Sequence, residues 1–155
     1  VNDALLGDAP LSPERAGAMP TGVMVELCMS GEYTKREIMK MLVGKGGFVS
    51  HFGTNDGREV SQMAENGDEK ARLVLDAMAY QVSKHIGANA AVLKGKIDGI
   101  IITGGLAYDK KIVGSIEDRI GFLAPVVAYP GEDELLALAQ GALRVLNGEE
   151  EAMIY

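Results

Sequence analysis

The 155-residue sequence contains a single cysteine, Cys28, and lacks any long uncharged apolar run. One thiol excludes an internal disulfide framework and favours a reducing compartment, so we expect a cytoplasmic protein. A membrane-spanning helix needs roughly 18 or more consecutive apolar residues, and their absence predicts that the chain does not enter a membrane. Cys28 lies in the apolar run 23–29, which predicts a core position, with a reactive thiol as the alternative.

Basic residues are few and scattered along the chain. The formal net charge is −7, from 15 Lys+Arg and 22 Asp+Glu. A nucleic-acid-binding surface needs clustered positive charge, so this composition argues against one. A nucleotide remains compatible, because a few local donors and a metal ion are enough to hold its phosphates. The sequence begins without an initiator methionine, from which we expect a piece of a longer protein, with a lost start as the alternative.

Apolar periodicity predicts several helices and two short strands. Thr34 and Glu37 have the spacing of a capping box, which indicates a helix start. The segment 97–103 is β-branched and too short for a helix, and 123–129 is similar, so both are expected to be buried parallel strands. The predicted elements are a buried helix at 23–30, a short helix between Thr34 and the glycines at 44–47, a helix at 68–93, strands at 97–103 and 123–129, a helix at 110–120, and a helix at 132–147 with its leucines facing inward.

The order strand–helix–strand–helix in the second half predicts an α/β fold with a parallel sheet and a right-handed crossover. Two strands make a poor sheet, so further strands are expected either in unrecognised segments or in a preceding part of the protein.

Ligands of open parallel sheets collect at the carboxyl ends of the strands. Gly104 and Gly105 follow the first strand, where backbone without side chains allows close approach of a ligand ring; a plain turn is the alternative. Glu132 and Glu134 follow the second strand. One of these carboxylates could hold a hydrated Mg²⁺, although carboxylates at a helix start also stabilise the helix dipole by themselves.

Two arginines near glycine- or proline-rich turns are further candidates. The segment 53–59 contains Asn-Asp-Gly, which is typical of a loop, and Arg58 just beyond it could stack on a base or pair with a phosphate. Arg15 lies between Pro13 and Gly17 and could stabilise charge on a transferring phosphoryl group. For each of them a solvated surface arginine is the alternative.

Taken together, six segments resemble the acetate and butyrate kinase family, which shares its fold with sugar kinases, heat-shock ATPases and actin. The resemblance covers essentially the whole chain and is closest to butyrate and branched-chain carboxylate kinases. It implies a C-terminal ribonuclease H-like domain of the actin-like ATPase fold, truncated at its N-terminal strands, with 1–155 as one nucleotide-binding domain of a two-domain kinase. The segments that carry it are 12–17, 42–47, 53–56, 77–81, 104–107 and 129–132.

The resemblance also implies roles for individual residues. Arg15 matches an arginine that faces the phosphoryl group during its transfer. Glu132 and Glu134 match the region that supplies a metal-associated carboxylate. Gly57 stands where acetate kinases carry a bulkier residue, and Ala107 replaces their glycine; both departures favour the butyrate branch over acetate. The residues that match the adenosine-binding segments are Asn55, Asp56, Arg58, Gly104, Gly105, Leu106 and Ala107.

The expected function is therefore phosphoryl transfer from ATP, with Mg²⁺, to a short-chain carboxylate such as butyrate or a branched-chain acid. The resemblance further implies a homo-oligomer. A nucleotide-binding module without turnover is the alternative, and a relative of carbohydrate or glycerol kinases is a weaker one.

Overall fold

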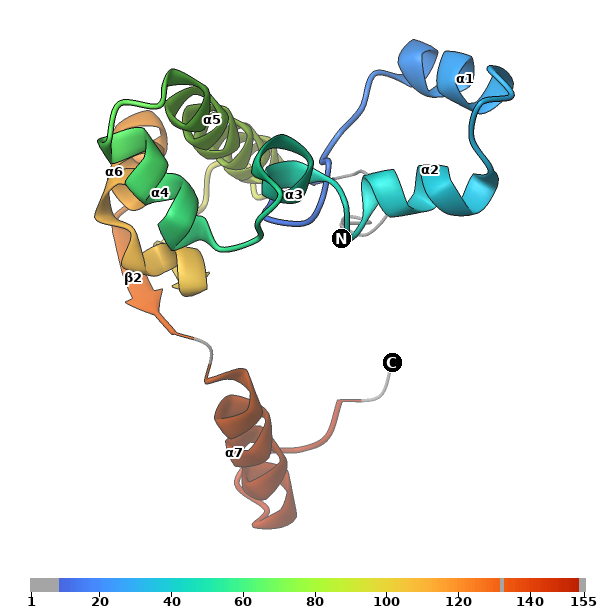
Figure 1. Ribbon diagram of the computed structural model, residues 1–155. Helices are drawn as coiled ribbons and strands as arrows, with labels where there is room; N and C mark the ends of the chain where they lie inside the picture. Colours follow the sequence, from blue (N-terminus) through green and yellow to red (C-terminus); the bar gives the residue numbers. More distant parts are fainter. Residues whose placement is uncertain (1–8, 132, 154–155) are drawn as a thin grey trace.

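The computed structural model describes residues 9–131 and 133–153 (Figure 1). Helices dominate, and the two strands form one small parallel sheet. The elements are α1 (Thr21–Met29), α2 (Lys35–Leu42), α3 (Gly47–Phe52), α4 (Gly57–Glu65), α5 (Glu69–Val92), β1 (Ile100–Gly104), the 3₁₀ helix η1 (Gly105–Tyr108), α6 (Lys110–Ile120), β2 (Val126–Pro130) and α7 (Glu134–Leu146).

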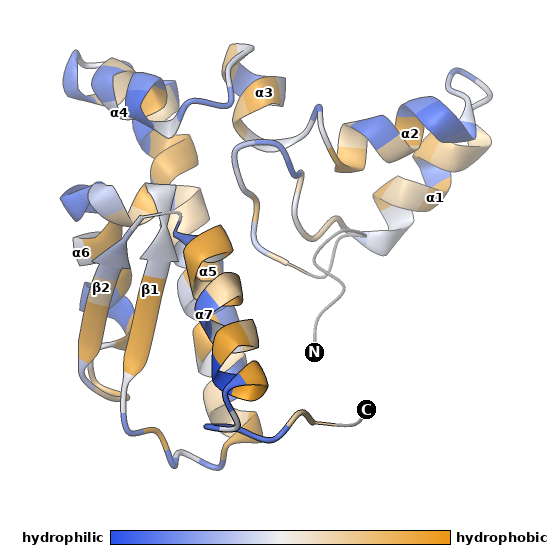
Figure 2. Cartoon of the chain, turned by 90° about the horizontal axis from the view of Figure 1, so that it is seen from below, coloured by the Kyte–Doolittle hydropathy of each residue, from blue (hydrophilic) through white to orange (hydrophobic). Residues whose placement is uncertain are grey.

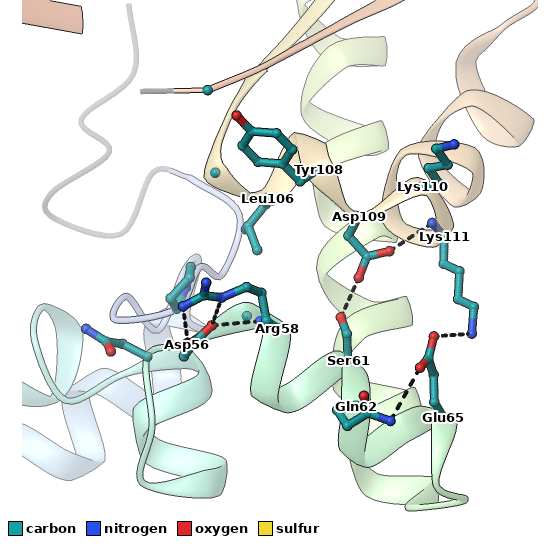
Figure 3. Close-up of a pocket in the computed structure, with 15 residues that line it drawn as sticks. Asp56, Arg58, Ser61, Gln62, Glu65, Leu106, Tyr108, Asp109, Lys110 and Lys111 are labelled. Atoms are coloured by element: carbon teal, nitrogen blue, oxygen red, sulfur yellow. Dashed lines mark hydrogen bonds and ion pairs between the residues drawn. The ribbon is translucent and has the colours of Figure 1, made fainter. Parts of the chain in front are cut away.

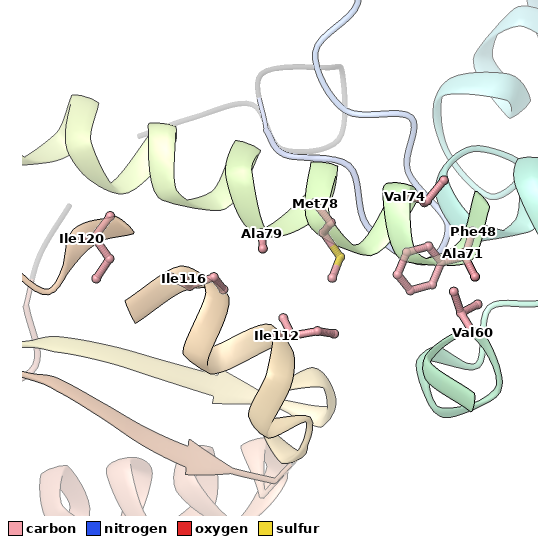
Figure 4. Packing of buried hydrophobic residues seen from close by; sticks show 9 residues of the cluster. All are labelled: Phe48, Val60, Ala71, Val74, Met78, Ala79, Ile112, Ile116 and Ile120. Atoms are coloured by element: carbon pink, nitrogen blue, oxygen red, sulfur yellow. The ribbon is translucent and has the colours of Figure 1, made fainter. Parts of the chain in front are cut away.

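Helix α5 is the central support of the packed part of the chain. It begins at the N-cap Asp68, whose side chain accepts a hydrogen bond from the Ala71 amide. Met78 and Ala79 of α5 are almost fully buried and belong to the same apolar cluster as Ile112 and Ile116 of α6 (Figure 4). The cluster comprises Phe48, Val60, Ala71, Val74, Met78, Ala79, Ile112, Ile116 and Ile120.

In the part of the chain that the structure describes, the sheet is covered on one face. Strands β1 and β2 pair in parallel, with Ile100 opposite Val126. Ile100, Ile102 and Val126 pack against the apolar cluster. Ile101 points away from it and is 65% exposed. We predicted two buried strands, and that prediction is wrong: among the described residues, helices pack against one side of the sheet, so β1 alternates between half-buried and exposed residues.

The segment with α1 and α2 lies beside this packed part (Figure 1). The predicted capping box is confirmed: the Thr34 side chain accepts from the Glu37 amide, and the Glu37 carboxylate accepts from the Thr34 amide. The prediction of a buried helix at 23–30 is wrong, since α1 buries no residue and Cys28 is exposed. Helix α1 is largely apolar and contacts α2, but within the described part of the chain no layer buries its side chains.

Helix α7 stands apart from the other helices in Figure 1. Its predicted apolar stripe is present, but the prediction that this stripe faces inward is wrong, since Leu135, Leu138 and Leu146 are all more than two thirds exposed. In Figure 2 hydrophobic residues recur along the α7 ribbon, separated by hydrophilic ones. Apolar periodicity correctly predicted the helix. No element among the described residues covers its apolar stripe.

Candidate functional site

A cavity of about 920 Å³ opens where α4 faces η1 and the start of α6 (Figure 3). This volume is within the range of small-molecule sites in proteins. The cavity lies at the carboxyl ends of β1 and β2, as expected for a parallel sheet, and Gly131 after β2 completes its rim. Its lining residues are Pro13, Asn55, Asp56, Gly57, Arg58, Ser61, Gln62, Glu65, Gly105, Leu106, Tyr108, Asp109, Lys110, Lys111 and Gly131.

The start of α4 holds an arginine in a fixed orientation at this cavity. Asp56 is the N-cap of α4 and accepts a hydrogen bond from the Arg58 amide at 2.9 Å. The two Asp56 oxygens also accept from Arg58 Nε at 3.0 Å and Nη2 at 2.7 Å, which forms a bidentate fork. These bonds from Arg58 lower the pKa of Asp56 to about 2. The fork engages one edge of the guanidinium and orients its plane, and because 91% of the side chain is exposed, both faces of the plane stay open.

We predicted 53–59 as a loop, and this is wrong from Gly57 onwards. Arg58 lies in the first turn of α4 rather than in a loop. The Asn-Asp-Gly sequence indicated a turn, but Asp56 acts as a helix N-cap, a role for which Asp is equally common.

The turn after β1 forms the opposite wall. Gly104 has φ of 91°, in the left-handed region where residues with a Cβ are disfavoured. The chain then continues as η1, in which Leu106 points toward the cavity and Ala107 is buried. A Cβ added to Gly57 would come within 2.5 Å of Leu106 Cδ2, so α4 and η1 are in close contact at this point.

Polar side chains link the same two walls further along. Ser61 of α4 donates a hydrogen bond to Asp109, and Glu65 forms an ion pair with Lys111 at 2.8 Å (Figure 3). Asp109 is the N-cap of α6 and accepts from the amides of Lys111 and Ile112. None of these four residues stood out in the sequence. The sequence shows a hydroxyl and a carboxylate four residues apart, which places both on one face of a helix. This spacing is common on solvent-exposed helices, so it does not by itself indicate a site.

The loop with Arg15 is held against the glycines that follow α2. The Gly44 amide donates to Glu14 O at 2.8 Å, and the Ala16 amide donates to Leu42 O at 3.0 Å. A Cβ on Gly47 would lie 1.6 Å from Ser12 O, and one on Gly46 would lie 2.2 Å from Ala16 N. These glycines are therefore required by close backbone approach, which explains physically why the segments 12–17 and 42–47 occur together.

The structure brings some predicted site residues together and separates others. Gly104 and Ala107 belong to the same turn as the cavity wall but do not line the cavity, and Ala107 is buried. The predicted residues that line it are Asn55, Asp56, Arg58, Gly105 and Leu106. The Asn55 amide donates to Glu14 at 2.7 Å and so joins the cavity to the loop of Arg15.

Arg15 itself is half-buried and does not line the cavity. Glu132, predicted as a metal-associated residue, lies outside the described residues. For Glu134 the structure describes the backbone, as the first residue of α7.

Within the described ranges, no three His, Cys, Asp or Glu side chains are grouped as metal ligands. Mg²⁺ in nucleotide sites commonly takes one or two carboxylates together with phosphate oxygens and water, so such a group is not required. None of the described helices is both long and apolar enough to span a membrane.

A family model for acetate kinase, described as the acetokinase family, matches residues 10–123. The chain is similar in structure to a propionate kinase from Francisella tularensis subsp. tularensis SCHU S4, with 23% identity and a TM-score of 0.66 over 77% of this chain and 37% of that one. It is similar to acetate kinase from Porphyromonas gingivalis, with 21% identity and a TM-score of 0.76 over 89% of this chain and 41% of that one. For acetate kinase from Entamoeba histolytica the values are 18%, 0.73, 89% and 43%.

The chain thus spans about two fifths of the length of these solved relatives. Their likeness confirms the predicted α/β fold, which is that of acetate kinases within the actin-like ATPase group. The family model covers well over half of the sequence, and the chain belongs to the acetokinase family.

Proposed function

We propose that the chain is the nucleotide-binding part of a carboxylate kinase. The observation that carries this proposal is the cavity itself, in which two segments distant in sequence, 55–58 and 105–106, meet face to face. A planar base would lie between the Arg58 guanidinium and the Gly105–Leu106 backbone, since guanidinium groups stack on flat rings. The proposed ligands are ATP or ADP with Mg²⁺.

The proposed reaction is the transfer of the terminal phosphoryl group of ATP to a short-chain carboxylate. A carboxylate oxygen attacks the γ-phosphorus, the bond from that phosphorus to the β,γ-bridging oxygen breaks, and ADP leaves as an acyl phosphate forms. Catalysis of this type depends on positioning and on neutralising charge. Mg²⁺ would supply part of that neutralisation.

Arg15 is the residue that we propose to meet the phosphoryl group. Its loop is fixed by backbone hydrogen bonds to residues 42–46, and Glu14 beside it is joined to Asn55 of the cavity. A guanidinium on a rigid loop is preorganised for charge that develops only in the transition state. The carboxylates at 132 and 134 stay proposed metal-associated residues, since they follow Gly131 at the rim of the cavity.

We further propose butyrate or a branched-chain acid as the preferred substrate, because Gly57 and Ala107 depart from the acetate kinase pattern. The solved relatives are named as acetate and propionate kinases, so a panel of acids is the appropriate test. In a two-domain kinase that contains this chain, acyl phosphate formation is expected to be fastest with butyrate or isobutyrate. A higher kcat/KM for acetate than for butyrate would contradict this preference.

Nucleotide binding without turnover is the second candidate, favoured by the partial coverage of the solved relatives. For the 155-residue chain by itself we expect ADP binding and no butyrate-dependent release of ADP from ATP. Calorimetric titration with ADP and a coupled ADP-release assay separate the two properties. Absence of ADP binding would contradict the proposed function, and turnover well above a blank would contradict the need for a second domain.

A further inference from the structure

Three contacts connect α4 to η1 and α6 in a regular series. Gly57 packs against Leu106, Ser61 donates to Asp109, and Glu65 pairs with Lys111. Gly57, Ser61 and Glu65 are spaced four residues apart and therefore share one face of α4. Their partners follow one another along η1 and the first turn of α6. The three contacts run along the wall of the cavity, as Figure 3 shows for the two polar ones.

The apolar core attaches both walls to α5. Val60 anchors α4 to α5, and Ile112 anchors α6 to α5, each as part of the apolar cluster. Each wall is therefore attached to the common support by different side chains. The contact of Gly57 with Leu106 and the two polar bridges connect the walls directly.

Asp109 both caps α6 and accepts the hydrogen bond from Ser61 of α4. One oxygen accepts from the Lys111 and Ile112 amides and so caps α6, and the other accepts from Ser61. The orientation of the α6 start is thereby coupled to α4. Because η1 directly precedes Asp109, the position of Leu106 in the cavity depends on the same anchor point.

We propose that Ser61 and Glu65, through Asp109 and Lys111, are positioning residues of the nucleotide site. They hold α4 and the 104–107 turn at the separation that a nucleoside needs when it contacts both walls. This inference rests on the proposed function, since it takes the cavity to be the nucleotide site. It adds two positions, 61 and 65, that neither nucleoside segment contains.

Calorimetric titration of the 155-residue chain with ADP tests the proposal. Ser61→Ala removes the donor and leaves Asp109 as the cap of α6, and we expect the Kd for ADP to rise about three- to tenfold. Ser61→Thr retains the hydroxyl and should restore the Kd to within about twofold of the unchanged chain. Glu65→Gln should raise the Kd about twofold, since the ion pair is solvent-exposed.

Reversal of the ion pair distinguishes positioning from simple loss of stability. The double variant Glu65→Lys with Lys111→Glu should bind ADP more tightly than either single change. Glu150→Gln is the matched control, because it removes a comparable surface ion pair with Arg144 at 2.9 Å, remote from the cavity. We expect it to leave the Kd unchanged. Melting temperatures of all variants should agree within a few degrees.

An unchanged Kd in folded Ser61→Ala, with normal ADP binding by the parent chain, would overturn this inference alone. Failure of the parent chain to bind ADP would overturn both the inference and the proposed function. A lower melting temperature that accounts for the entire loss of affinity, without rescue by Ser61→Thr, would assign Ser61 to folding and overturn the positioning role.

Discussion

Helices α5 and α7 both carry apolar side chains at helical spacing, yet only α5 buries them. Met78 of α5 is 2% exposed, whereas Leu138 of α7 is 70% exposed. The difference lies in what surrounds each helix, since α4 and α6 pack on α5 while α7 stands apart. Apolar periodicity thus reports the tendency to form an amphipathic helix, and burial requires a partner surface that periodicity does not identify.

The largest expected effect is a difference in stability between the two helices. Met78→Ala should lower the free energy of unfolding by about 2–5 kcal/mol, because it opens a cavity in the core. Leu138→Ala should change it by no more than about 0.5 kcal/mol, as exposed substitutions usually do. Urea unfolding followed by circular dichroism measures both. An equal loss for the two variants would show that α7 is packed in solution.

In a two-domain kinase that contains this chain, substitutions at the proposed site should affect catalysis, whereas substitutions on α7 should not. Arg15→Ala should lower turnover by two to three decades, the loss of roughly 3–4 kcal/mol expected for a donor aimed at developing charge. Arg15→Lys should restore little of it, because an ammonium lacks the planar fork. Arg58→Ala should mainly raise the KM for ATP, as removal of uniform binding does.

Steady-state kinetics at saturating butyrate distinguish these effects, with Leu138→Ala on α7 as the control expected to be normal. Near-normal turnover in Arg15→Ala would contradict the role of Arg15 at the phosphoryl group and would show that it is an ordinary surface arginine.

Self-association is expected to involve the uncovered surfaces. The two strands leave unpaired sheet edges in the described part of the chain, and the exposed stripe of α7 adds an apolar surface. Sedimentation equilibrium should give a mass above 16.4 kDa at high concentration. Leu138→Lys should weaken association, whereas Leu73→Lys, at a similarly exposed site on α5, should not. A clean monomer would contradict this prediction.

Sequence analysis identified the helices at 68–93 and 110–120 almost to the residue, because caps and periodicity coincide there. Asp68 precedes an apolar-periodic segment and caps α5, and side-chain caps are local signals; the helix at 110–120 was predicted from its periodicity. Ser61 and Lys111 could not be found in this way. Their partners are 48 and 46 residues away in sequence, and only the packing of both helices on α5 brings them together.

The smallest expected effect concerns the fork at the start of α4. The pKa of Asp56 is lowered from 3.8 to about 2, first of all by the side-chain hydrogen bond from Arg58. The carboxylate therefore adds stability that is fully present above about pH 4 and is lost as the pH falls toward 2.

Wild type should be slightly more stable than Asp56→Asn at pH 7, and the difference should vanish near pH 2. Thermal melts across this range measure it, and a difference that does not depend on pH would contradict the ionic role.

Hydrogen–deuterium exchange with and without ADP and Mg²⁺ tests the central claim most directly, because it reports every region in one experiment. If the cavity between α4 and η1 is the nucleotide site, ADP should slow exchange in 57–65 and 104–111 and leave α1 and α7 unchanged. Protection confined to α1, α2 or α7, or no protection at saturating ADP, would contradict it.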